Sequence, residues 1–120
     1  MTKLTMIFAL LLAHHGGAVF EQNPKTLKGM VTEFAWTNPH VQIYLDVKDA
    51  KGSVVHWAVE TISPGKLARG SGWKKNSLKP GDEITITLQQ AKTGAPVGNL
   101  RKIVLADGKV LTPTETAPEY

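Results

Sequence analysis

The sequence predicts an all-β domain, a five-stranded OB-like closed barrel with one short helix between the third and fourth strands. Apolar and polar residues alternate in several short segments that glycine- and proline-containing turns separate, which is typical of half-buried strands. The chain of 120 residues is long enough for one hydrophobic core and too short for two. Five strands in so short a chain protect their edges best when the sheet closes on itself. An open sandwich or meander is the alternative.

The first expected strand, TLKGMVTEFAW, changes its inward face partway along. Its apolar residues begin on one parity, at Leu27 and Val31, and continue on the other, at Phe34 and Trp36. Such a strand is usually bulged or sharply coiled, and Gly29 is a suitable position for the bend. A coiled first strand is what allows five strands to close into a barrel.

The next two expected strands form a β-hairpin. HVQIYLDVK alternates without a fault, so that its valines, Ile43 and Leu45 point to one side. DAKG supplies the turn, and SVVHWAVETI follows with Val55, Trp57 and Val59 on one face. If both strands turn these faces inward, the numbers of paired residues sum to an even value of about 100 or 102.

This register determines the surroundings of two histidines. It places His56 opposite Tyr44 or Asp46, and it places His40 opposite Glu60 or the isoleucine two positions later. Four to six strand positions then separate His40 from His56, about 13 to 20 Å, so the two cannot share one metal ion. We therefore expect His56 to be an exposed partner of Asp46, and Glu60 to accompany His40.

The remaining elements are a short helix and two more strands. Ser63 and Pro64 indicate an N-cap followed by proline at the first helical position, and the helix is expected to end near Gly70. EITITLQQ and LRKIVLA are the fourth and fifth strands, followed by a brief extension at residues 109–111. Residues 112–120 contain two prolines and no periodicity, so we expect a disordered tail.

The N-terminus has the order of a secretory signal peptide, a short positive segment followed by the apolar run LTMIFALLLA. This run is about half of the roughly 20 residues that a membrane-spanning helix needs, so we expect no stable membrane anchor after cleavage. Cleavage after Ala13 or after Ala18 fits, with the small residues around Ala18 the better match. We expect a signal peptide at 1–13, an N-terminal arm at 14–25 and an OB-like barrel domain at 26–111, in a periplasmic or secreted protein.

The composition excludes several kinds of site. Without cysteine, the chain has no disulfides, zinc–thiolate sites, thiol nucleophiles or iron–sulfur clusters. The formal net charge of +4 is spread along the chain, which does not indicate a nucleic-acid-binding surface. The sequence also lacks a nucleophile elbow and a glycine-rich loop between a strand and a helix. We therefore expect neither catalytic residues nor a nucleic-acid partner.

Several short motifs follow one another between about Ala13 and Leu111: AHH, TLKG, TNPH, YLDVKDA, SPGKLAR, LKPGD and DGK. Together they resemble a family of small exported bacterial proteins that is defined only as a domain of unknown function. In the pattern of this family the signal peptide ends just before the double histidine, which implies that His14 is the mature N-terminus. Gly16 and Gly17 depart from the small polar and aromatic residues usual after these histidines. The resemblance implies no established activity.

A mature chain that begins with His14 and His15 carries a strong chelating group. Its amino group, its two imidazoles and the amide nitrogen between them can hold one ion in five- and six-membered rings, an arrangement that suits copper. Deprotonation of these ligands costs little at neutral pH. His40 lies on the outward face beyond the stiff TNPH turn and is the third expected ligand. The groups expected around these ligands are Glu60, Asn38 and Tyr44.

The sequence thus favours an exported barrel that captures or delivers a transition metal, with copper as the expected ion. The metal ion and another periplasmic protein are the expected partners. The alternative is a non-catalytic interaction module that holds a protein or a glycan on the barrel face around Tyr44, Trp36 and Trp73. A copper-dependent oxidative enzyme is the weaker third option, because no substrate groove is evident in the sequence.

Overall fold

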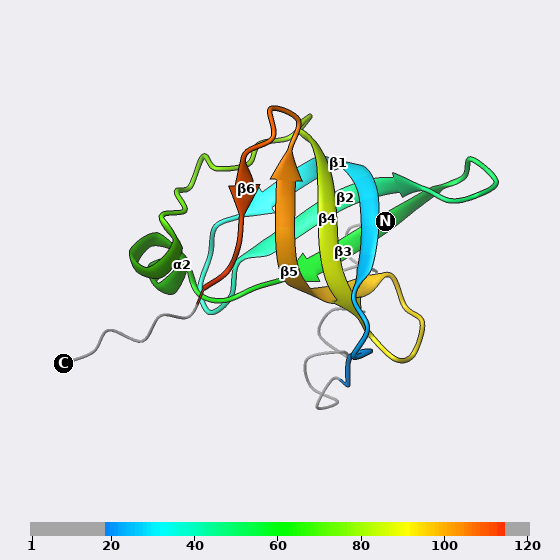
Figure 1. The fold of residues 1–120 in the computed structure, drawn as a ribbon, viewed down its shortest axis with the longest axis horizontal. Coiled ribbons are helices and arrows are strands. Elements are labelled where there is room, and N and C mark those ends of the chain that lie inside the picture. Colours follow the sequence, from blue (N-terminus) through cyan, green and yellow to red (C-terminus); the bar gives the residue numbers. More distant parts are fainter. Residues whose placement is uncertain (1–18, 115–120) are drawn as a thin grey trace.

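The computed structural model describes residues 19–114, and the structural statements below refer to that part of the chain. It contains six strands and one helix (Figure 1). In chain order they are β1 (Lys25–Ala35), β2 (Gln42–Lys48), β3 (Val54–Glu60), α2 (Pro64–Ser71), β4 (Glu83–Gln90), β5 (Val97–Leu105) and β6 (Val110–Leu111).

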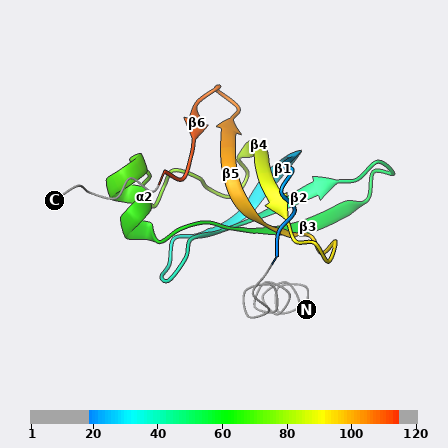
Figure 2. The same ribbon diagram turned by 60° about the horizontal axis from the view of Figure 1, so that its bottom comes forward.

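The first five strands close into a barrel, as predicted. The strand order is β3-β2-β1-β4-β5-β6, and a parallel pairing of β3 with β5, from Ala58 opposite Val97 to Glu60 opposite Asn99, joins the two sides of the sheet. The helix α2 lies at one end of the barrel, and the β2–β3 hairpin projects at the other (Figures 1 and 2). The all-β, OB-like architecture with a helix between the third and fourth strands is therefore confirmed.

The strand β1 is shared between the two sides of the barrel. Its first half pairs with β4, its second half pairs with β2, and Met30 belongs to both ladders. The predicted change of face occurs at a register shift between Val31 and Glu33, slightly later than the expected bend at Gly29. Gly29 has a different role, because a Cβ atom there would lie 2.6 Å from the carbonyl oxygen of Asp46. Glycine at this position allows β1 and β2 to cross closely.

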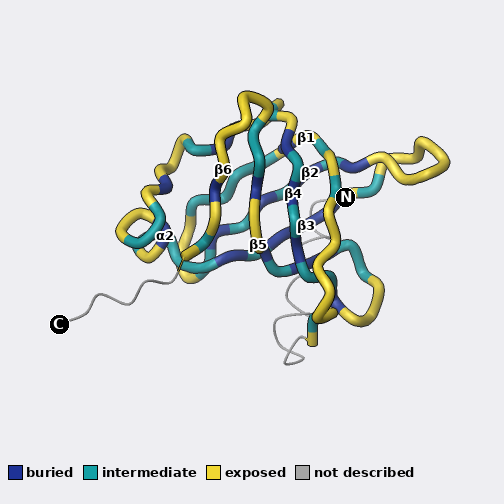
Figure 3. The backbone as a smooth tube through the Cα atoms, in the orientation of Figure 1, coloured by how far each residue is buried: buried dark blue, intermediate teal, exposed yellow. Residues whose placement is uncertain are grey.

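The core fills the interior of the barrel. Along the strands, buried residues that point into it alternate with more exposed ones that point outward (Figure 3). The largest fully buried side chains come from all of the long strands, from α2 and from the segment after it: Trp73, Ile43, Leu45, Leu67, Ile86, Leu88, Ile103, Val31, Val41 and Val59. Burial of this apolar surface stabilises the closed barrel.

The helix α2 begins as predicted and ends slightly later. The Ser63 hydroxyl accepts a hydrogen bond of 3.3 Å from the Lys66 amide, and Pro64 occupies the first turn. The helix ends at Ser71, next to the predicted end near Gly70, and Gly72 follows in the left-handed conformation, with φ of 71°.

The beginning of the predicted tail is held in place. The Trp73 indole nitrogen donates a hydrogen bond of 3.1 Å to the Thr112 carbonyl oxygen, and the Thr114 amide donates one of 2.8 Å to the Ser71 hydroxyl. These two hydrogen bonds connect the backbone of Thr112 and Thr114 to Trp73 and Ser71. Residues 115–120 lie outside the described part of the chain.

The predicted signal peptide and its two possible cleavage sites, together with His14 and His15, also lie outside the described residues. Within residues 19–114, no helix is long and apolar enough to cross a membrane.

Candidate functional site

The hairpin register matches the even-sum prediction. Gln42 is opposite Glu60 and Asp46 is opposite His56, so that paired residue numbers sum to 102. The His56 Nδ1 atom lies 2.5 Å from Asp46 Oδ1. His56 is therefore an exposed partner of Asp46, as expected.

His40 is paired with Glu60, as the sequence also predicted. The His40 Nδ1 atom lies 3.0 Å from Glu60 Oε1, and the histidine side chain is 37% exposed against 19% for the glutamate. The adjoining backbone is fixed because Val41 forms hydrogen bonds with Thr61 and Ile62, of 2.9 and 3.0 Å. His40 is thus a partly exposed imidazole on a rigid strand end, with a carboxylate on one of its nitrogens.

The turn before His40 contains a feature that the sequence did not predict. The peptide bond between Asn38 and Pro39 is cis. Asn38 itself is exposed at this turn. The sequence showed that proline would stiffen the turn, but the choice between cis and trans is made by the folded surroundings.

Tyr44 lies on the same outer face as Glu60, two strand positions from Gln42. Its hydroxyl donates a hydrogen bond to the Gln42 side-chain oxygen. Burial raises the pKa of Tyr44 above its ordinary value of 10.0, and the negative charges of Glu33 and Glu60 raise it further. The Glu33 and Glu60 carboxylates are therefore close enough to Tyr44 to act on its hydroxyl.

The N-terminal arm docks on this face. Phe20 forms an isolated bridge with Ala91, the Glu21 amide donates a 2.7 Å hydrogen bond to the Gln90 carbonyl, and the Lys92 amide donates a 3.0 Å bond to the Val19 carbonyl. The first described residues of the chain are thus bound to the end of β4.

The Phe20 side chain completes a small second core outside the barrel. Ala58, Ala91 and Val97 form its buried centre, and Phe20 and Tyr44 both pack against them. An aromatic residue within an otherwise polar arm was the available indication, but the strand edge that receives it is created only by the fold.

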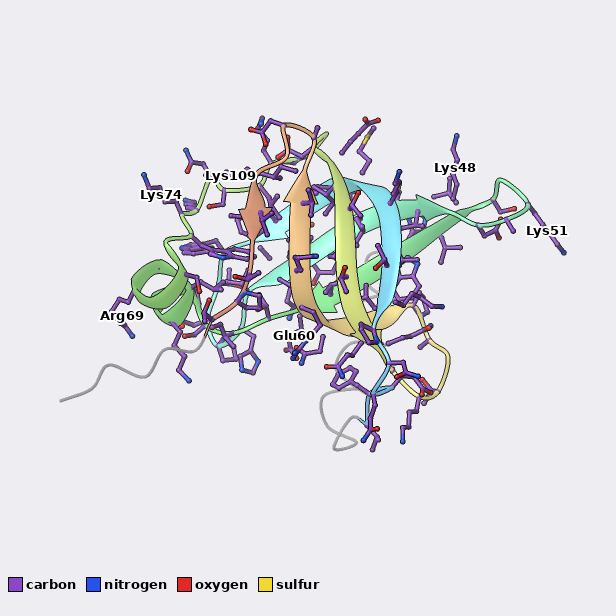
Figure 4. The ribbon with its side chains drawn as sticks, viewed as in Figure 1. Lys48, Lys51, Glu60, Arg69, Lys74 and Lys109 are labelled. Carbon is purple, nitrogen blue, oxygen red and sulfur yellow. The ribbon has the colours of Figure 1, made fainter. Side chains whose placement is uncertain are left out.

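The two histidine pairs lie toward opposite ends of β2. Six positions separate His40 from Asp46, which corresponds to about 20 Å along a strand. Figure 4 shows Glu60 well away from Lys48 and Lys51 on the projecting hairpin. Among residues 19–114, no three His, Asp or Glu side chains converge into a metal-binding group. Any site at His40 therefore needs ligands from elsewhere.

The structure corrects one part of the expected interaction face. Trp73 is only 1% exposed and lies in the barrel core, so it cannot form that face with Tyr44 and Trp36. Trp36 is partly buried, and its ring centroid is 5.7 Å from that of Phe34, which in turn lies 6.3 Å from the Trp73 ring. These aromatic rings close the helix end of the core rather than forming an open stacking surface.

Comparison with known proteins identifies a family and a fold. Residues 4–100 match the sequence model of a family of unknown function, DUF6152. A search among curated proteins gives no match.

Solved structures resemble this chain at low sequence identity. The mitochondrial single-stranded DNA-binding protein Rim1 from S. cerevisiae is 11% identical with a TM-score of 0.53, over 73% of this chain and 95% of that chain. TiaS in its complex with a transfer RNA and ATP is 19% identical with a TM-score of 0.45, over 69% of this chain and 18% of that chain. At such identities the Rim1 similarity shows the fold alone.

Proposed function

This chain belongs to the DUF6152 family of unknown function, and we propose that it is an exported barrel protein that binds copper for capture or delivery. The proposed ligands are the mature N-terminal amine, His14 and His15, with His40 as the third side chain. The observation that carries the proposal is the 3.0 Å contact between His40 Nδ1 and Glu60 Oε1.

A carboxylate on one ring nitrogen is the usual partner of a metal-ligating histidine. It fixes the tautomer and the orientation of the ring and makes the other nitrogen more basic. Here Glu60 binds Nδ1 of His40, so Nε2 is the nitrogen that would coordinate the metal. The neighbouring Glu33, whose charge also acts on Tyr44, favours a cation at this face.

The docked N-terminal arm supports a shared site of His14, His15 and His40. Phe20 packs beside Ala58, and Glu60 follows Ala58 by two positions on the same face of β3, about 7 Å along the strand. Val19 follows His15 by four positions, and an extended chain of this length reaches about 13 to 14 Å. This reach exceeds the distance of about 7 Å that separates Ala58 from Glu60 along the strand.

The test begins with the N-terminus of the exported protein, determined by mass spectrometry. We expect a chain that starts at His14 and takes up one equivalent of Cu(II) tightly in competition with a chelator. Replacing His14 and His15 together by alanine should abolish this uptake. His40→Ala should weaken it by about 10- to 100-fold, whereas Lys102→Ala, on the exposed face of β5, should leave it unchanged.

Two results would refute the proposal. One is a mature chain that starts at Val19, which lacks both His14 and His15. The other is tight Cu(II) uptake that survives the double replacement of His14 and His15. Either result would favour the non-catalytic interaction module, with a protein or glycan bound near Tyr44.

A further inference from the structure

Positive charge gathers at the helix end of the barrel. Residues 61–81, which include α2 and the loop after it, contain five lysine and arginine residues and neither aspartate nor glutamate. All five are exposed: Lys66, Arg69, Lys74, Lys75 and Lys79. Figure 4 shows Arg69 and Lys74 at this end of the barrel, opposite Lys48 and Lys51 on the projecting hairpin. The helix end thus receives a run of positive charge that no acidic residue interrupts.

The segment around β6 adds a further cation to the same surface. The Trp73 indole nitrogen donates a hydrogen bond of 3.1 Å to the Thr112 carbonyl oxygen, so the loop after α2 lies against the chain that follows β6. Lys109, directly before β6, is exposed and lies on the same side of the barrel as Lys74 (Figure 4). Residues far apart in the sequence therefore contribute to one basic surface.

Two carboxylates accompany these cations. The Lys79 ammonium lies 3.0 Å from Asp82 Oδ1, so the charge of this lysine is balanced. Asp107 accepts a hydrogen bond of 2.9 Å from the backbone amide of Lys109, which leaves the ammonium of that side chain at the surface. We call the following four residues the basic end: Arg69, Lys74, Lys75 and Lys109.

We propose that the basic end docks on a membrane whose leaflet carries anionic phospholipids. Its exposed side chains project from α2, from the following loop and from the turn before β6, and so present a broad array of charge rather than an enclosed site. Each lysine or arginine near an anionic leaflet strengthens binding about fivefold. Val110, next to Lys109, is 53% exposed, and an apolar side chain among cations can enter the headgroup layer.

A lipid surface fits this end of the barrel better than a nucleic acid does. Proteins hold single strands partly through exposed aromatic side chains on which the bases stack. The Trp73 ring at this end is only 1% exposed, and Phe34 and Trp36 are partly buried beside it. The basic end therefore offers charge without these rings as a stacking surface, and a phospholipid leaflet needs none.

The experiment measures cosedimentation of the mature exported protein with vesicles. One set contains phosphatidylglycerol and phosphatidylcholine, the other phosphatidylcholine alone, and EDTA is present so that metal ions do not bridge protein and lipid. We expect binding only to the anionic vesicles. Binding at about 0.1 M salt should be lost at about 1 M salt, because the Debye length falls from about 10 Å to about 3 Å.

Two double variants locate the surface. Lys74→Gln with Lys75→Gln should weaken binding about 25-fold, since each lysine contributes about fivefold. Lys48→Gln with Lys51→Gln removes the same charge from the hairpin end, and at about 0.1 M salt it should leave binding nearly unchanged because distant charges are screened. All four lysines are exposed, so both variants should melt at the wild-type temperature.

Three results would overturn the proposal. The first is no binding to anionic vesicles at about 0.1 M salt. The second is equal weakening in the two double variants, which would indicate a response to net charge alone. The third is tighter binding of a single-stranded DNA oligonucleotide than of the vesicles, which would assign the basic end to a nucleic acid. None of these results bears on copper, because the assay contains EDTA and changes no proposed ligand.

Discussion

Replacing Gly29 by alanine tests the close crossing of β1 over β2. The added Cβ atom would lie 2.6 Å from the Asp46 carbonyl oxygen, 2.9 Å from Val47 Cγ2 and 3.0 Å from Leu45 Cδ1. Ordinary contact begins at 3.4 Å, so two strands must separate. The nearest atom belongs to the backbone, and a change of rotamer cannot relieve that contact.

The expected cost follows from this geometry. Overpacking of a well-packed site costs typically about 1 to 3 kcal/mol, and a backbone clash places Gly29→Ala near the upper value. A loss of about 1 kcal/mol lowers the melting temperature of a domain of this size by roughly 4 to 8 °C. We therefore expect Gly29→Ala to melt about 12 to 24 °C below the wild-type protein.

Thermal unfolding followed by circular dichroism measures this difference, and Gly65→Ala provides the matched control. A Cβ atom at Gly65 would lie 3.0 Å from Arg69 Nη1, the mobile end of a long side chain, and the residue is in the first turns of α2. Alanine favours a helix over glycine by about 0.5 to 1 kcal/mol, so the control should melt at or slightly above the wild-type temperature. A decrease of less than about 4 °C in Gly29→Ala would refute the close-crossing argument.

Two further predictions concern Thr61 and Tyr44. The Thr61 hydroxyl is buried and lacks a hydrogen-bond partner in the described part of the chain. Thr61→Val should therefore raise the free energy of unfolding, measured by urea titration, by about 1 kcal/mol. A loss of stability would show that the hydroxyl does form a hydrogen bond. The phenol of Tyr44 should titrate above 10.0 by ultraviolet absorbance, since its pKa is raised in the folded protein, and Glu33→Gln should lower the midpoint. Because the folded state retains this proton longer than the unfolded state, stability should fall as pH rises above 10.0, and a pH-independent free energy of unfolding there would contradict the assignment.

The hairpin was predictable because strand alternation fixes which residues face inward. Once Ile43 and Val59 point inward, a shift of one residue would expose them, so only even sums remain; of the two registers left open, the structure adopts the one that pairs Asp46 with His56. The same alternation places His40 opposite Glu60 or the isoleucine two positions later, and the structure pairs it with Glu60.

Other features depend on contacts between distant segments. The bulge after Val31 could be expected but not positioned, since its location depends on how β1 divides its pairing between β2 and β4. The hydrogen bonds that hold Thr112 and Thr114 come from Trp73 and Ser71, far away in sequence. Local patterns contain no information about such partners, which is also why the burial of Trp73 was not predicted.

The parallel pairing of β3 with β5 has a consequence for how the chain folds. β1 pairs with β2, and β2 with β3, along short connections, whereas Ala58 finds Val97 only across about 40 intervening residues, including α2 and β4. Closing so long a loop is entropically costly and yields only three paired residues on β3, so we expect closure to come late. Until it does, β3 presents an open edge that can recruit another strand, and newly made chains are most vulnerable to aggregation before β5 arrives.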